Sequence, residues 1–187
     1  FGEIATTSFF PSKPLGCYGD GGAVFTDDSS LFEKLKMIRN HGQKNRYIHD
    51  ILGLNGRMDT LQAAIILAKL EIFKNEIQER QDIAGFYDEA LKDSAIETPK
   101  ISVDNASAWA QYTIRSAKRE QLQKHLSAAQ VPSSVHYPKP LHLQPIFNDS
   151  KSSLPVAEKA ANEVLSIPMH PYLSTEDLKN DSDKDKE

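Results

Sequence analysis

The sequence predicts an α/β protein in two parts, and three patterns lead to this prediction. Two short runs rich in β-branched and aromatic residues, 6–10 and 23–26, indicate paired strands at the edge of a larger sheet. A long apolar pattern of helical period over 61–91 indicates one extended helix. After Trp109 a strand, a helix and another strand follow one another, which is typical of a small α/β domain.

The composition excludes several classes of function. The 187 residues are 39% hydrophobic and 26% charged, as in an ordinary globular chain, and the net charge is −4. This slightly negative charge gives no sign of a basic surface that would bind nucleic acid or an anionic membrane. No apolar run is long enough to span a bilayer. The single cysteine, Cys17, allows neither an internal disulfide nor a cysteine-based metal site. We therefore expect a cytoplasmic protein with no nucleic-acid or membrane partner.

The two strands are followed by a helix, a polar loop and the long helix. Asp28 and the serines after it form an N-cap signal for a helix over 31–40. The mixed-charge segment 44–50 indicates a loop, and Asp59 or Thr60 caps the long helix. The wide apolar arc in the first half of that helix indicates burial on two sides. We expect the helix to leave the larger domain where it becomes charged, near 76–81.

The second part is predicted to be smaller and mixed. In order, it holds a linker over 94–105 with a short strand at 100–103, a strand over 109–115, a helix over 118–130, a strand over 133–137, a helix over 154–165 and the start of a last helix at 174–177. We predict residues 1–78 as the remainder of a large domain and 79–178 as a small domain. Residues 179–187 contain no apolar residue and are predicted to be a disordered tail.

The loop between the first two strands contains the candidate catalytic residue, Lys13. Residues 11–22 hold two prolines, four glycines and this one lysine. Pro11 and Pro14 restrict the backbone on both sides of Lys13. Composition alone favours a surface hairpin with a solvated lysine, since most loop lysines are of that kind. The alternative is a lysine presented to a bound group.

The order of residues around Lys13 resembles a known family. Residues 8–16 read Ser-Phe-Phe-Pro-Ser-Lys-Pro-Leu-Gly, and residues 18–23 read Tyr-Gly-Asp-Gly-Gly-Ala. Both are similar to the cofactor-lysine segment of the DegT/DnrJ/EryC1/StrS family of pyridoxal-phosphate-dependent sugar aminotransferases. The resemblance covers about residues 6–178. It implies the C-terminal part of a fold-type I aminotransferase: the end of the large-domain sheet plus a small α/β C-terminal domain.

The resemblance also implies roles at the cofactor. Lys13 takes the place of the lysine that forms the Schiff base with pyridoxal 5′-phosphate, and Ser8 that of a serine at the cofactor phosphate. Residues 55–59 match the family's Asn-x-Arg-Met-Asp segment. In the family this asparagine reaches the cofactor phosphate of the neighbouring subunit, which assigns Asn55, and Arg57 resembles a residue that contacts the nucleotide sugar. A turn asparagine and a surface arginine are the simpler interpretation.

His136 and Tyr137 match the family's His-Tyr-Pro segment, where both side chains approach the sugar nucleotide in the partner's active site. The resemblance therefore implies a homodimer with shared active sites.

A histidine at a strand end is more often structural, and a metal site from His136, His142 and His170 is a further alternative. Their spacing matches no recognised ligand pattern, so we predict no metal.

Further segments resemble one branch, the UDP-2-acetamido-2-deoxy-ribo-hexuluronate aminotransferases. These segments are 61–65, 69–73, 110–113 and 166–172. The branch aminates the 3-keto group of a UDP-N-acetylhexosaminuronic acid with glutamate as amino donor, for O-antigen and lipopolysaccharide synthesis. Two alternatives remain. A pyridoxal-phosphate-dependent sugar dehydratase would usually carry histidine in place of the lysine. A truncated, non-catalytic paralogue would only dimerise or bind sugar nucleotide. Because the family's first half is absent, we expect the parent protein to begin upstream and this chain alone to be inactive.

Overall fold

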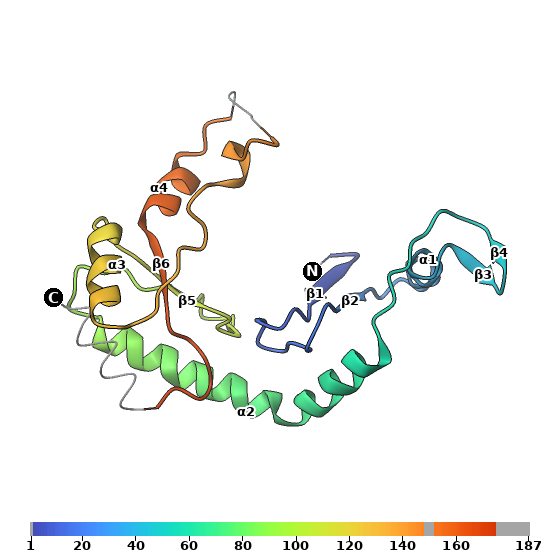
Figure 1. Cartoon of the computed structure of the whole chain (residues 1–187), viewed down its shortest axis with the longest axis horizontal. Coiled ribbons are helices and arrows are strands. Elements are labelled where there is room, and N and C mark those ends of the chain that lie inside the picture. The colour runs from blue at the N-terminus through green and yellow to red at the C-terminus, as the bar shows by residue number, and fades with distance from the viewer. Residues whose placement is uncertain (1, 148–151, 175–187) are drawn as a thin grey trace. The chain divides into compact units, whose positions relative to one another are not determined.

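The computed structural model describes residues 2–147 and 152–174, and Figure 1 shows the order of their helices and strands. The chain divides into two compact units, Phe1–Lys74 and Asn75–Glu187, and the division falls inside the longest helix. The predicted domain limits of 1–78 and 79–178 stay a prediction. The predicted tail over 179–187 and all but the first residue of the predicted last helix lie outside the described residues.

The first unit begins with the predicted pair of strands. Strand β1 (Ala5–Ser8) pairs antiparallel with β2 (Gly22–Phe25), and Ser8 lies opposite Gly22 at the end where the connecting loop begins. Phe9 and Phe10, predicted as the end of the first strand, belong to the loop instead. Pro11 follows them and has no backbone N–H for a strand ladder, so pairing stops before it.

Helix α1 (Ser29–Arg39) confirms the predicted helix and its cap. The Asp28 carboxylate accepts the backbone N–H groups of Ser30 and Leu31 at 2.7 and 3.0 Å, and these bonds lower the pKa of Asp28. The predicted polar loop contains a short hairpin, β3 (Gln43–Asn45) and β4 (Ile48–His49).

Helix α2 (Thr60–Ala90) confirms the predicted long helix, and its N-cap position is Asp59, whose carbonyl accepts the Ala63 N–H. The first half of α2 was expected to be buried on two sides, but within this chain it is not. Ile66 is buried, whereas Leu61 and Leu67 are 69% and 65% exposed. The β1–β2 loop contacts the side of α2 that carries Gln62 and Lys69, which leaves other apolar positions open to solvent.

The second unit packs the C-terminal half of α2 with a two-stranded sheet and a helix. Strand β5 (Tyr112–Arg115) pairs antiparallel with β6 (Val164–Ile167), and α3 (Arg119–Ala128) contributes the fully buried Leu126. The core consists of aromatic and aliphatic side chains from these four elements and from the residues that flank them: Ile83, Ala84, Tyr87, Leu91, Trp109, Tyr112, Ile114, Leu126, Val131, Leu165 and Ile167.

Two of the strand predictions in the second unit are wrong. The segment 100–103 contains no strand, because a turn closes there with the Asn105 N–H donating to the Ser102 carbonyl at 2.9 Å. Glu97 instead forms the backbone bridge to Arg115. The segment 133–137 is reduced to a single bridge between Ser134 and Ser166.

The predicted helix over 154–165 is also too long. Helix α4 (Pro155–Glu163) ends at Glu163, and β6 begins at the next residue, Val164. The apolar spacing at 164 and 165 fits either structure, but pairing with β5 buries Leu165 completely. A short 3-10 helix, η1 (Leu141–Leu143), lies in the proline-rich connection before α4. In the described part of the chain, no helix combines the length and the apolar character needed to cross a membrane.

Candidate functional site

The loop that carries Lys13 is held by its own backbone. The Phe9 N–H donates to the Gly21 carbonyl at 2.8 Å, which extends the β1–β2 pairing into the loop. The Lys13 N–H donates to the Phe10 carbonyl at 2.9 Å and closes a four-residue turn with Pro11 at its second position, where proline is favoured. The turn leaves Lys13 exposed.

Cys17 and Gly21 form the packed base of this loop. The buried Cys17 thiol lies 3.0 Å from the carbonyl oxygens of both Phe9 and Gly19. A Cβ atom at Gly21 would lie 2.8 Å from the Met58 sulfur and 3.0 Å from that of Cys17, so a side chain has no room there. Glycine at this position therefore lets the loop base pack closely.

Helix α2 anchors the same loop through two polar side chains that were not predicted from the sequence. The Gln62 Oε1 accepts the Tyr18 N–H at 2.8 Å, and the Lys69 ammonium donates to the Gly16 carbonyl at 2.7 Å. The ammonium also lies 5.2 Å from the centre of the Tyr18 ring, within cation–π range. Gln62 and Lys69 lie two turns apart on the same side of α2. Two polar residues at this spacing among the apolar residues of the helix were the sequence pattern that could have predicted the anchor.

We expect Lys69→Met to weaken this anchor while keeping the aliphatic stem. The variant leaves the Gly16 carbonyl without its charged donor, which should lower the free energy of unfolding by about 1–2 kcal/mol. Thermal unfolding gives the overall loss, and hydrogen exchange at residues 16–19 should become faster. Lys74→Met makes the same change at an exposed position of α2 and should leave both measurements unchanged. Equal exchange in the two variants would contradict the anchor.

Lys13 and Ser8 together fit the chemistry of pyridoxal phosphate. Ser8 Oγ accepts the Phe10 N–H at 3.2 Å, so its hydroxyl proton is left to donate to a phosphate oxygen. Within residues 2–147 and 152–174, no carboxylate forms an ion pair with the Lys13 ammonium. The hairpin therefore presents an amine for an aldehyde carbon and a hydroxyl for a phosphate.

Asn55 and Arg57 lie in the segment before α2, and the structure brings them together. The Arg57 Nε donates to Asn55 Oδ1 at 3.1 Å, and both side chains are exposed. The backbone of Asn55 forms a bridge to Asn40 at the end of α1. Because the carboxamide oxygen is occupied, the Asn55 amide nitrogen is the group left to donate to another oxygen.

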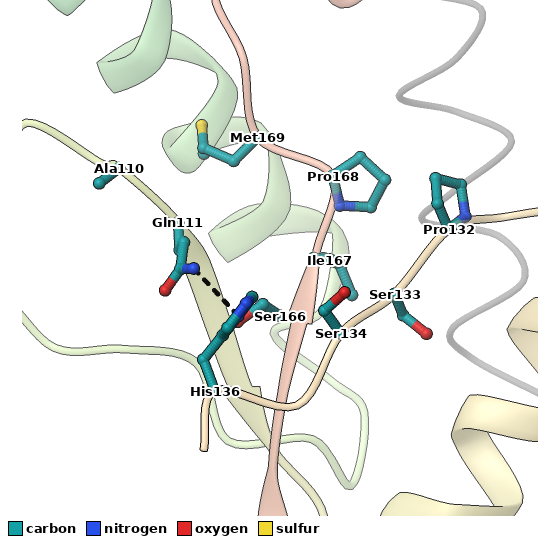
Figure 2. A pocket seen from close by; sticks show the side chains of 10 residues that line it. All are labelled: Ala110, Gln111, Pro132, Ser133, Ser134, His136, Ser166, Ile167, Pro168 and Met169. Carbon is teal, nitrogen blue, oxygen red and sulfur yellow. Dashed lines mark hydrogen bonds between the residues drawn. The ribbon is translucent and has the colours of Figure 1, made fainter. Parts of the chain in front are cut away.

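His136 lies at a small cavity in the second unit, and Tyr137 lies beside it. The cavity has a volume of about 190 Å³, and Figure 2 shows the side chains that line it. The His136 Nδ1 is 3.0 Å from Gln111 Nε2 and 3.0 Å from the buried Ser166 Oγ. The Tyr137 ring is 73% exposed and meets the His136 ring edge-on at 5.5 Å.

The other histidines considered for a metal site do not join His136. His142 Nε2 lies 3.1 Å from the Glu158 carboxylate, while His170 Nδ1 lies 3.2 Å from the Tyr172 amide nitrogen. The Leu154 N–H and then His142 lower the pKa of Glu158. Among the described residues, no group of three histidine, cysteine, aspartate or glutamate side chains is placed to hold a metal ion.

Comparison with known proteins assigns the family. The model of the DegT/DnrJ/EryC1/StrS aminotransferase family matches residues 1–181. The chain belongs to this family. The prediction from the Lys13 segment is confirmed, and the family's aminotransferases depend on pyridoxal phosphate. No comparison tests the roles of individual residues, so the six assigned side chains stay predictions.

Individual relatives and solved structures agree with this result. The chain is 57% identical over 176 residues to UDP-2-acetamido-2-deoxy-3-oxo-D-glucuronate aminotransferase from Pseudomonas aeruginosa, covering 94% of this chain and 49% of that protein. A DegT DnrJ EryC1 StrS aminotransferase from Brucella abortus superposes with a TM-score of 0.94 at 44% identity, covering 99% of this chain and 50% of that one. DesV from S. venezuelae gives a TM-score of 0.94 at 37% identity, covering 98% and 51%.

These matches confirm the predicted fold class, an α/β part of a sugar aminotransferase of the pyridoxal-phosphate-dependent kind. The chain spans about half the length of the curated relatives it matches.

Proposed function

We propose that this family member transfers the amino group of glutamate to a UDP-linked 3-keto sugar, namely UDP-3-keto-N-acetylhexosaminuronic acid. The observation that carries the proposal is the hairpin that presents Lys13, combined with family membership. The substrate class rests on the 57% identity to an enzyme named for a UDP-linked 3-oxo-glucuronate.

Pyridoxal phosphate, when bound, supplies an aldehyde and an electron sink for the carbon that exchanges its amine. Lys13 would hold the aldehyde carbon through its ε-amine and, once released, would move a proton between the substrate carbon and the cofactor. Ser8 would donate its hydroxyl proton to the phosphate. The Asn55 amide would donate a second hydrogen bond there without adding charge.

Substrate recognition is assigned to Arg57, His136 and Tyr137. The Arg57 guanidinium is exposed and offers several donors, which suits a diphosphate or a carboxylate. We propose that these residues and Asn55 serve the Lys13 of a second copy of the protein, so that the enzyme is a homodimer with shared active sites. Its product would feed O-antigen and lipopolysaccharide synthesis in the cytoplasm.

The substrate assignment predicts a clear preference in a direct assay. The full-length protein, supplied with pyridoxal phosphate and glutamate, is expected to aminate a UDP-linked 3-keto N-acetylhexosaminuronic acid faster than the 4-keto isomer. The amount of 2-oxoglutarate formed measures each rate, and mass spectrometry identifies the amino sugar. The same sugar carried on dTDP serves as the control for the nucleotide. Turnover of the 4-keto sugar alone would contradict the assignment.

A further inference from the structure

We infer that Gln111 and Ser166 are positioning residues that hold the His136 ring with Nδ1 as hydrogen-bond acceptor, so that the neutral ring carries its proton on Nε2. In this form His136 offers the substrate an oriented N–H donor for an oxygen acceptor. The inference rests on the proposed function for the identity of that substrate. The state of the ring itself can be measured without turnover.

The contacts around Nδ1 determine the form of the ring. Figure 2 shows the Gln111 and Ser166 side chains beside His136, with a dashed line for the hydrogen bond from Gln111. The Gln111 amide nitrogen, which can only donate, lies 3.0 Å from Nδ1. A nitrogen that accepts this bond carries no proton, and in a neutral imidazole the proton must then be on Nε2.

Ser166 supports the same arrangement from the buried side. Its hydroxyl lies 3.0 Å from His136 Nδ1 and 2.9 Å from the Thr113 hydroxyl, and Ser166 is only 6% exposed. Either hydroxyl of the Thr113–Ser166 pair can be the donor, so Thr113 can donate to Ser166 Oγ and leave the Ser166 hydroxyl to donate to Nδ1. In that arrangement Nδ1 shares its one lone pair between the Gln111 amide and the Ser166 hydroxyl, and both contacts are compatible with Nδ1 as the acceptor.

The sheet fixes these side chains in place. Thr113 lies directly opposite Ser166 in the β5–β6 pair. The backbone of Ser166 also exchanges hydrogen bonds of 2.8 and 3.0 Å with Ser134, two residues before His136. Three segments distant in sequence therefore set the position of the ring, and rotation of the imidazole would break contacts to two of them.

The remaining ring nitrogen is the one available to a ligand. Among the described residues, Nε2 of His136 forms no hydrogen bond, and the side chain is half-buried at the cavity. The volume of about 190 Å³ lies below the roughly 300–1,000 Å³ of pockets that enclose a whole ligand. The site thus suits one acceptor group of the sugar nucleotide, such as its carboxylate, and not the complete molecule.

The test is a nitrogen NMR experiment on the full-length protein with ring-labelled histidine. Long-range proton–nitrogen correlations distinguish a protonated from an unprotonated ring nitrogen, and the difference from His136→Gln assigns the signals. We expect Nε2 to be protonated in the wild type. Ser166→Ala combined with Gln111→Met should produce a mixture of both neutral forms. A wild-type ring protonated on Nδ1, or a double variant with unchanged signals, would overturn the inference.

Kinetics of the same variants separate positioning from simple structural damage. The double variant should raise KM for the sugar nucleotide about tenfold and leave KM for glutamate unchanged. The single variant Ser166→Thr keeps the hydroxyl and should show the wild-type spectrum and KM. It provides a second comparison with the wild type if the double variant is unstable. Ser127→Ala, on an exposed turn of α3, is the control. If no UDP-linked keto sugar is turned over, the proposed function fails, while the NMR result still decides the state of His136.

Discussion

Replacing Lys13 by alanine is expected to lower the transamination rate of the full-length protein by about 10³-fold or more. The variant loses the amine that holds the cofactor aldehyde and the group that moves the proton, and a positioned proton-transfer group alone contributes about 10²–10⁴-fold. Stopped-flow measurement of the half-reaction with glutamate gives the rate. The visible absorption of the wild-type protein, which borohydride should remove, is expected to change in the variant.

Two controls separate loss of the amine from loss of the fold. Lys34→Ala changes an exposed lysine of α1 and should retain the wild-type rate and absorption. Added methylamine should restore part of the rate to Lys13→Ala, because a free amine can take over the proton transfer. A Lys13→Ala protein with wild-type activity would exclude this residue as the cofactor lysine.

The second large effect is expected at Arg80, a buried cation in α2. Arg80 is 9% exposed, and its Nη1 donates to the carbonyl of Trp109 at 2.8 Å and to that of Met169 at 3.2 Å. Burial lowers the pKa of its guanidinium, and the nearby Glu76 opposes this shift. One side chain therefore ties the segment before β5 and the segment after β6 to the helix.

We expect Arg80→Met to lower the free energy of unfolding by about 2–4 kcal/mol. Methionine keeps the apolar stem but leaves the buried Trp109 carbonyl and the partly buried Met169 carbonyl without their charged donor. An unsatisfied buried acceptor costs about 1–3 kcal/mol, and a partly buried one costs less because water can reach it. Denaturant unfolding followed by circular dichroism gives the loss.

The control for this prediction is Arg39→Met, which makes the same substitution at an exposed position of α1. A surface substitution of this kind should stay within about 0.5 kcal/mol of the wild type. If Arg80→Met were as stable as Arg39→Met, the two carbonyl contacts would not contribute to stability.

The sequence by itself determined the elements whose signals are local. The Asp28 cap, the long apolar pattern of α2 and the periodic apolar residues of α3 act within a few residues along the chain, and all three helices were predicted correctly. The restricted backbone around Lys13 was predicted for the same reason, because Pro11 and Pro14 each fix their own φ; the turn that the Lys13 N–H closes came from the structure. The order of residues around Lys13 also identified the family.

Only the tertiary structure decided the features that depend on pairing between distant segments. Val164 and Leu165 fit a helix or a strand equally well by spacing, and β5 selects the strand by burying Leu165. The contacts of Lys69 with the Gly16 carbonyl and of Ser166 with His136 join residues 53 and 30 positions apart. No local pattern encodes such contacts, because each depends on a backbone placed by packing elsewhere in its unit.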